Sequence, residues 1–335
     1  MIYYVATERH LRGTRKFLRS NPRMKSILKA LTYEELLFQR GGPIGHYIFT
    51  DHDRLSRFEL DCVSLFSKEL KQVAPDARQL NHPAYVKDRF PMLVALHKAG
   101  INRFTATRIE TGDDPVKFPV FIRSEDGCRG PETGLIEDSI AYAAALENLR
   151  LEGKTRRGRI AIGFAAQAGQ DGYYRKYGAY RIGGEILPHH LHYGRHWVVK
   201  RSDIDNESAL RDAMVKEELA YVSDNPHREA LVNVFEIAGV DFGRVDYGIV
   251  DGRLAIYEIN TNPKLPGFNR SDDRNAVRAI TKPQMFDGFQ SLDTPIQTNK
   301  RFVRFRMPKP RDHPFRWPIR SLPKAVFRLV FGYGA

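Results

Sequence analysis

Two stretches of alternating hydrophobic and polar residues, separated by Asp251-Gly252, constrain the fold of this chain more than any other feature. The stretches are RVDYGIV (244–250) and LAIYEIN (254–260), and this alternation is typical of half-buried strands. Asp-Gly between two such strands favours a tight β-hairpin. The apolar face of the expected hairpin carries Val245, Tyr247, Ile249, Ala255, Tyr257 and Ile259. We expect this face to be covered by other parts of the protein.

The polar face of the hairpin gathers Arg244, Asp246, Glu258 and Asn260, because residues two apart in a strand share a face. A three-residue loop over 251–253 would set Asp246 directly opposite Glu258, at about 5 Å. A strict two-residue loop would put the two carboxylates on opposite faces. A shared site therefore requires either the three-residue loop or a compensating β-bulge.

Two carboxylates and an amide oxygen form a hard-oxygen cluster of the kind that suits Mg²⁺. Mg²⁺ usually keeps several waters and bridges to substrate phosphates. Arg244, on the same face, would stabilise negative charge that develops at a reacting centre. The alternative is an ordinary surface hairpin with cross-strand ion pairs.

Composition narrows the class of protein. The chain has 335 residues, 42% of them hydrophobic, which suits a folded protein of about two domains. It has no apolar run near the roughly 20 residues that span a bilayer, and it opens without a secretory signal pattern. The two cysteines, Cys62 and Cys128, exclude a disulfide framework or an all-cysteine metal site. We therefore expect a cytoplasmic protein.

The net charge of +13 is concentrated at the ends of the chain. Residues 300–335 hold ten Lys or Arg against one acid, Asp312. Such a segment predicts an anionic partner, with an acidic glycan or a lipid surface (peripheral to the membrane) favoured over nucleic acid. The alternative is a solubilising surface without a partner. The pattern indicates no oligomeric state.

The expected elements follow an α/β rhythm. We expect strands over residues 2–6, 46–50, 118–123, 159–165, 175–188 and 196–200. We expect helices over residues 8–31, 56–73, 91–99, 137–150, 207–222 and 226–238. Glycines gather in SEDGCRGPETG (124–134), which predicts a flexible loop after the third strand.

At these positions the sequence resembles ATP-grasp enzymes. RVDYGIVDGRLAIYEINTNP resembles their metal-binding hairpin, and Asp88-Arg89 resembles the entry to their N-terminal lobe. FPVFIRSEDGCRG resembles a strand with a phosphate-binding cation followed by a glycine-rich flap, with Arg123 in the place of the usual lysine. YRIGGEILP and WVVK, which ends at Lys200, resemble a later strand pair that ends near the phosphates. The similarity covers roughly residues 46–270 and is strongest to the D-alanine–D-alanine ligase and glutathione synthetase-like type.

The resemblance implies an α/β (α+β) fold in which two lobes clasp ATP after a small open α/β domain. We accordingly expect a pre-ATP-grasp domain over 1–80 and an ATP-grasp domain over 81–290. Its N-terminal lobe would cover about 81–155 and its C-terminal lobe about 156–290. A basic C-terminal tail would occupy 291–335.

The resemblance also implies an ATP-dependent ligase, which activates a carboxylate as an acyl phosphate and joins it to an amine or thiol. ATP and Mg²⁺ would be the cofactors. Asp246, Glu258 and Asn260 would bind Mg²⁺, while Arg89, Arg123 and Lys200 would hold phosphates. Gly127, Gly130 and Gly134 would let the flap close over the triphosphate, and Arg244 would stabilise the anionic intermediate. The alternatives are a kinase that uses the same metal cluster, and a non-catalytic nucleotide-binding protein that docks an anionic partner through its basic ends.

One further cluster, His189, His190 and His192, has no assigned place in this resemblance. These residues would be zinc ligands, contacts for a substrate or phosphate, or ordinary residues where a strand ends.

Overall fold

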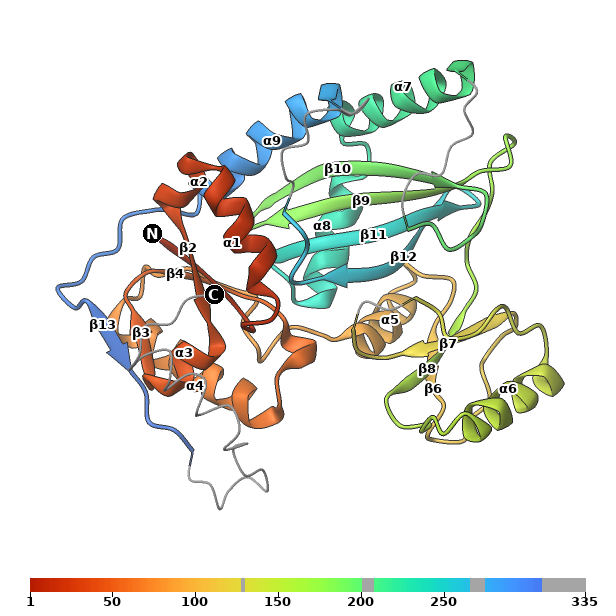
Figure 1. Cartoon of the computed structure of the whole chain (residues 1–335), viewed down its shortest axis with the longest axis horizontal. Helices are drawn as coiled ribbons and strands as arrows, with labels where there is room; N and C mark the ends of the chain where they lie inside the picture. The colour runs from red at the N-terminus through yellow and green to blue at the C-terminus, as the bar shows by residue number, and fades with distance from the viewer. Residues whose placement is uncertain (128–129, 201–207, 266–274, 309–335) are drawn as a thin grey trace. The chain divides into compact units, whose positions relative to one another are not determined.

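The computed structural model describes residues 1–127, 130–200, 208–265 and 275–308, and it divides the chain into two compact units (Figure 1). Unit 1 comprises Met1–Ala84 and, of the later residues described, 264–265 and 289–308. Unit 2 comprises Tyr85–Pro263 and 275–288. Residues 309–335, most of the expected basic tail, lie outside the described residues.

Unit 1 is built on a parallel sheet. Its strands are β1 (Ile2–Ala6), β2 (Leu28–Thr32), β4 (His46–Phe49) and β5 (Gln79–Leu80), in the order β2-β1-β4-β5. Its helices are α1 (Leu11–Ser20), α2 (Pro22–Ile27), α3 (Tyr33–Phe38) and α4 (Arg57–Val73), with a 3₁₀ turn at His52–Arg54. Parallel strands joined by helices are the open α/β arrangement that the sequence predicts.

The single basic helix expected over 8–31 is wrong. The chain instead forms α1, then α2, then the strand β2. Pro22 stands at the first turn of α2, where its missing N–H leaves no hydrogen bond unmade, so it starts a new helix. Leu28 and Thr32 are buried in β2, which pairs with β1 along its whole length.

Part of the expected tail belongs to unit 1. Strand β13 (Phe302–Arg304) pairs antiparallel with β3 (Gly41–Pro43). Val303 and Phe305 are buried in the same core as Phe66 of α4. The separate tail therefore does not begin at residue 291.

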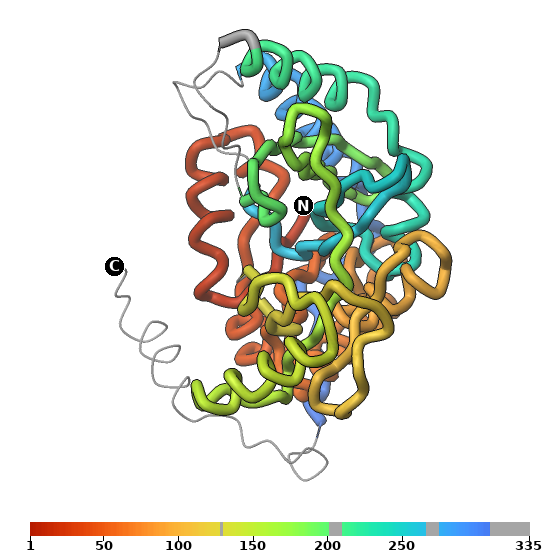
Figure 2. Tube along the Cα trace, turned by 90° about the vertical axis from the view of Figure 1, so that its right-hand side faces the viewer, coloured from red at the N-terminus to blue at the C-terminus, as the bar shows by residue number. Residues whose placement is uncertain are grey.

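Unit 2 contains a large antiparallel sheet and a small one. The large sheet has β9 (Tyr174–Ile182), β10 (Glu185–Gly194), β11 (Phe242–Val250) and β12 (Arg253–Asn260), in the order β10-β9-β11-β12. The small sheet has β6 (Ala106–Arg108), β8 (Arg159–Gly163) and β7 (Val120–Ser124), in the order β6-β8-β7. Figure 2 shows the chain after β8 passing from the small sheet to the large one.

Helices complete unit 2. They are α5 (Arg89–Lys98), α6 (Ser139–Leu151), α7 (Ser208–Asp224), α8 (Arg228–Ala238) and α9 (Asn275–Gln290), of which the last two residues belong to unit 1. The stretch expected as one strand over 175–188 is instead most of a hairpin, β9–β10, and residues 196–200 form no strand. Among the described residues, no helix is both long and apolar enough to cross a membrane.

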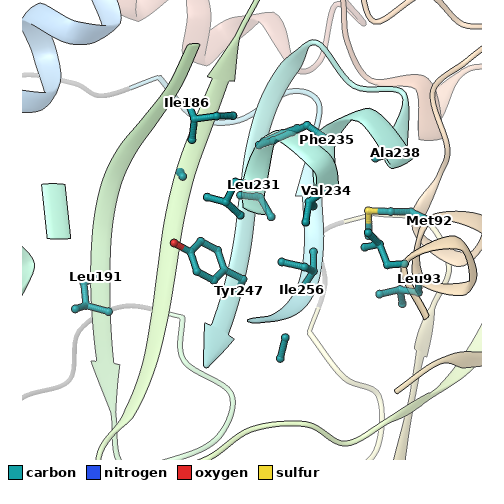
Figure 3. Packing of buried hydrophobic residues seen from close by; sticks show 14 of the residues in the cluster. Met92, Leu93, Ile186, Leu191, Leu231, Val234, Phe235, Ala238, Tyr247 and Ile256 are labelled. Atoms are coloured by element: carbon teal, nitrogen blue, oxygen red, sulfur yellow. The ribbon is translucent and has the colours of Figure 1, made fainter. Parts of the chain in front are cut away.

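The apolar face of the large sheet packs against α8. Figure 3 shows Leu231, Val234 and Phe235 of α8 beside Tyr247 and Ile256 of the sheet. Met92 and Leu93 of α5 join the same core. Helices cover this face, as expected, although Ile256 and not Tyr257 lies opposite Tyr247 on it. Two polar side chains of β9 also lie on the covered face: Arg175 pairs with Glu217 of α7, and the guanidinium of Arg181 lies over the Phe235 ring of α8. Asp246 and Glu258 lie on the other face.

Candidate functional site

The turn of the β11–β12 hairpin has two residues, not three. Val250 pairs with Arg253, and the intervening Asp251 and Gly252 have φ values of 48° and 71°. Positive φ at both positions is typical of the type I′ turn that matches the twist of a hairpin. Of the two alternatives that the sequence left open, the three-residue loop is therefore wrong.

A β-bulge nevertheless brings the two carboxylates together. Tyr247 pairs with Ile256, but Asp246 pairs with Glu258, so Tyr257 is the extra residue of the bulge. The Tyr257 ring lies against Gly248, and its Oη donates to the Ala165 carbonyl at 3.0 Å. The bulge alternative is thus confirmed.

The pairing continues across the whole sheet. Gly178 of β9 pairs with Asp246 on one side and with His190 of β10 on the other. His190, Gly178, Asp246 and Glu258 therefore form one row over four strands, which we call the carboxylate row. The neighbouring row carries Tyr180, Arg244 and Asn260.

Asp246 is buried at 2% exposure and is neutralised by two cations. Arg244 donates to it twice, from Nε to Oδ1 at 2.7 Å and from Nη2 to Oδ2 at 3.1 Å. Lys176 Nζ lies 3.5 Å from Oδ2. Burial alone would lower the pKa of Arg244, but the Asp246 and Tyr180 groups beside it outweigh burial and raise that pKa. Arg244 is therefore a fixed positive charge on this face.

Glu258 is held by two arginines, Arg89 and Arg123. Arg89 Nη2 donates to its Oε2 at 2.8 Å, and Arg123 Nη2 lies 3.6 Å from the same oxygen. Burial pushes the pKa of Glu258 upward, but the two guanidinium groups outweigh burial and hold that pKa below its ordinary value. Glu258 is accordingly an anion at neutral pH. Asn260 Nδ2 donates to its other oxygen at 3.4 Å.

Arg89 also contacts the start of the glycine-rich loop. Its guanidinium donates to the carbonyls of Ser124 at 3.3 Å, Glu125 at 2.8 Å and Gly127 at 3.0 Å. Arg89 is the first residue of α5, the helix that precedes strand β6 of the small sheet in the chain. One side chain thus connects the flap segment to a carboxylate of the large sheet.

Lys200 and Gly130 meet elsewhere. A Cβ placed on Gly130 would lie 3.6 Å from Lys200 Nζ. The two residues line a cavity of about 460 Å³ together with residues 131–135 and 196–198. Among the described residues, Lys200 makes no ion pair with Asp246 or Glu258. The structure therefore gathers the expected site residues into three groups. Arg244 contacts Asp246. Arg89, Arg123 and Asn260 contact Glu258. Gly130 lies beside Lys200.

Sequence reasoning missed Lys176, Gly178 and the position of His190. Alternation in YRKYGAYRI places Lys176, Gly178 and Tyr180 on one face of a strand, and the sequence alone could have predicted this. The pairing of β9 with β11 joins residues about 70 positions apart, and no local pattern predicts it.

The oxygen donors of the carboxylate row and of Asn260 in the neighbouring row fit Mg²⁺. Asp246 and Glu258 are directly paired across two strands, and Asn260 adds an amide oxygen. No group of three or more His, Cys, Asp or Glu side chains suited to a metal occurs in the described part of the chain. Two carboxylates suffice for Mg²⁺, since it takes its other ligands from water and phosphate oxygens.

Comparison with known proteins identifies the fold. No family model matches the sequence, and no curated protein matches it. Among solved structures, D-alanine–D-alanine ligase from Bacillus anthracis, crystallised with ATP, aligns with a TM-score of 0.50 at 12% identity, over 87% of this chain and 94% of the ligase. The chain has the ATP-grasp fold. A RimK-domain ATP-grasp protein from Sphaerobacter thermophilus aligns with a TM-score of 0.49 at 14% identity, over 86% of this chain and 98% of that one.

The predicted fold class is therefore confirmed. At this identity the ATP-grasp likeness establishes architecture, while the chemistry has to be argued from this chain's own side chains.

Proposed function

We propose that this protein is an ATP-dependent ligase that activates a carboxylate as an acyl phosphate and joins it to an amine. The observation that carries the proposal is the carboxylate row, in which Asp246 and Glu258 are directly paired and each is held by cations. This arrangement stands on an ATP-grasp fold shared with a ligase that was crystallised with ATP.

The residues around Glu258 suit the nucleotide. Asp246, Glu258 and Asn260 would hold Mg²⁺, which would supply positive charge to neutralise the phosphates. Arg89 and Arg123 present guanidinium groups, which pair with phosphate oxygens in the same forked geometry as with carboxylates. The contact of Arg89 with the Gly127 carbonyl would couple the flap to the occupancy of this site. Gly130 and Lys200 would complete the phosphate contacts.

Arg244 suits the reacting centre. Its guanidinium is fixed by two hydrogen bonds to Asp246, so it offers a preorganised positive charge. Such a charge stabilises the oxyanion that develops when a carboxylate attacks a phosphoryl group or an amine attacks an acyl phosphate. Because the charge is already in place, little reorganisation is needed in the transition state.

Product analysis tests the ligase chemistry. We expect ADP and phosphate to be released from MgATP only when a carboxylic acid is present together with an amine, in a panel of amino acids and small acids. Replacing the amine with hydroxylamine should trap the acyl phosphate as a hydroxamate. Arg244→Lys should lower kcat about 10²-fold, on the order of one lost oxyanion contact. Arg253→Lys, an exposed arginine on the same hairpin, is the control and should retain full activity.

Two outcomes would contradict this proposal. A stable phosphorylated product without hydroxamate would show a kinase. MgATP turnover that is independent of both acid and amine would show that neither is a substrate.

A further inference from the structure

His190 occupies a place on the carboxylate row that glycine makes possible. Its imidazole lies over Gly178, where a Cβ would come within 2.2 Å of Cε1 and 2.4 Å of Nε2. Any other residue at 178 would displace the ring. His190 is 4% exposed, and among the described residues its buried Nε2 has no hydrogen-bond partner. A buried polar atom without a partner is costly, and it indicates a group that a ligand satisfies.

The neighbours of His190 are cationic or aromatic. His192 stacks on it with ring centroids 4.1 Å apart, and His189 lies edge-on at 5.4 Å. Burial holds the pKa of His190 well below its ordinary value, and the nearby His192, Arg244 and Lys176 lower it further. The ring is therefore neutral at neutral pH, with one N–H to donate, and it stands in a positive field.

The two ends of the carboxylate row are well separated. His190 and Glu258 lie three strand spacings apart, which is about 14 Å. Arg89 and Arg123 contact Glu258 and therefore serve the far end of the row. Lys176 pairs directly with His192 across β9 and β10, and its Nζ reaches Asp246. The end at His190 thus has its own cations.

We propose that this end of the row is an oxyanion subsite for the acid substrate, in which His190 donates a hydrogen bond from Nε2. Lys176 and Arg244 supply the positive charge, and Gly178 makes room for the ring. The oxyanion is a carboxylate and not a nucleotide phosphate, since the arginines at the other end already suit the phosphates. The inference rests on the proposed function only for the identity of the substrate as a carboxylic acid. Its test measures anion binding and does not require catalysis.

The test is anion binding to the full-length protein, followed by the ring signals of His190 in NMR spectra. The signals are assigned by their loss in His190→Gln. Sodium acetate is the carboxylate probe and inorganic phosphate is the phosphoryl probe. We expect acetate to shift the His190 signals saturably, and Lys176→Met to weaken its binding at least 10-fold.

A matched pair of glycine variants tests the role of the ring position. Gly178→Ala should abolish the acetate response, because the new methyl group displaces the imidazole. Gly184→Ala, in the turn of the same hairpin, has open space around its Cβ and should respond as the wild type does. If Gly178→Ala fails to fold, broadening of the acetate methyl signal by wild type but not by His190→Gln gives the same answer.

Each remaining outcome is decisive. If neither anion shifts the His190 signals, the subsite does not exist. If phosphate shifts them and acetate does not, the anion is a phosphoryl group and the assignment to the acid substrate is overturned. MgATP binding is measured on the same samples. Lost MgATP binding with an intact acetate response would contradict the proposed function alone, and the reverse would contradict this inference alone.

Discussion

Glu258 shows how two cations decide the ionisation of one buried group. Because the pKa of Glu258 is lower in the folded chain than its ordinary value of 4.5, its ionised form favours folding at neutral pH. That contribution is fully present above the ordinary value and is lost as the pH falls through the lowered pKa. The pairing with Arg89 and Arg123 therefore predicts weaker stability in acid.

Arg89→Met should raise the pKa of Glu258, because it removes the guanidinium that donates to Oε2 at 2.8 Å. The carboxyl ¹³C signal of Glu258, followed as a function of pH, measures the change. Arg108→Met is the control, since that arginine pairs with Glu125, the residue after β7, and not with Glu258. An unchanged titration in Arg89→Met would show that Glu258 owes its low pKa to other groups.

Single residues were predicted well where the chemistry is local. Arg244 shares a face with Asp246, and Glu258 shares a face with Asn260, as their spacing in the sequence indicates, while the bulge at Tyr257 brings the two pairs onto one face of the hairpin. His190 was noticed only as part of a histidine cluster. Its place depends on Gly178 and on a strand pairing that is set by tertiary structure.

At the scale of elements, the register of the β11–β12 hairpin decides whether it carries a shared site. Deleting Tyr257 removes the bulge but should leave Asp246 opposite Glu258, because Ile256 already pairs with Tyr247. MgATP binding should then stay within about threefold of wild type, a difference of about 0.7 kcal/mol. Deleting Ile256 and Tyr257 together should set Glu258 opposite Tyr247 on the apolar face, because a one-residue shift reverses every side chain in a strand, and binding should be lost. Calorimetry on both variants measures this. Equal binding by the two variants would show that the register does not decide whether the carboxylates share a site.

Helix α7 is anchored to the sheet by buried hydroxyl groups. Tyr221 Oη donates to the Gly178 carbonyl at 3.1 Å and receives a hydrogen bond from Tyr247 Oη at 3.1 Å. Tyr221→Phe removes both of these buried hydrogen bonds and should cost about 1–3 kcal/mol of unfolding free energy. Urea unfolding measures the cost. Tyr85→Phe, at a residue 70% exposed, should cost nothing measurable, and a similar loss in both variants would contradict the argument.

At the scale of the whole molecule, the sequence predicted the α/β class and the order of most elements but not all their limits. The α4 helix begins at its Ser56–Glu59 capping box, close to the expected start. Boundaries failed where a local pattern was ambiguous. The basic stretch over 8–31 has helical composition throughout, yet Leu28–Thr32 joins a sheet, because pairing with β1 outweighs helix propensity.

The end of the chain gives a prediction at this scale. A truncation after Thr298 removes β13 and the buried Val303 and Phe305, so it should destabilise unit 1 by roughly 3–6 kcal/mol. A truncation after Pro308 keeps those residues and should be the more stable of the two truncated proteins. The melting temperatures of the two truncated proteins, measured by thermal unfolding, give this difference in stability. Equal melting temperatures would mean that β13 contributes little to the core of unit 1.

Binding of MgATP tests the central claim most directly. Calorimetry on the full-length protein should show Mg²⁺-dependent ATP binding that Glu258→Gln weakens at least 10-fold. Glu147→Gln is the matched control, because that glutamate is exposed and pairs with Arg150 on α6, and its binding should equal that of wild type. Absence of binding by folded wild-type protein, or equal binding by Glu258→Gln, would contradict the assignment of the carboxylate row as a nucleotide and metal site.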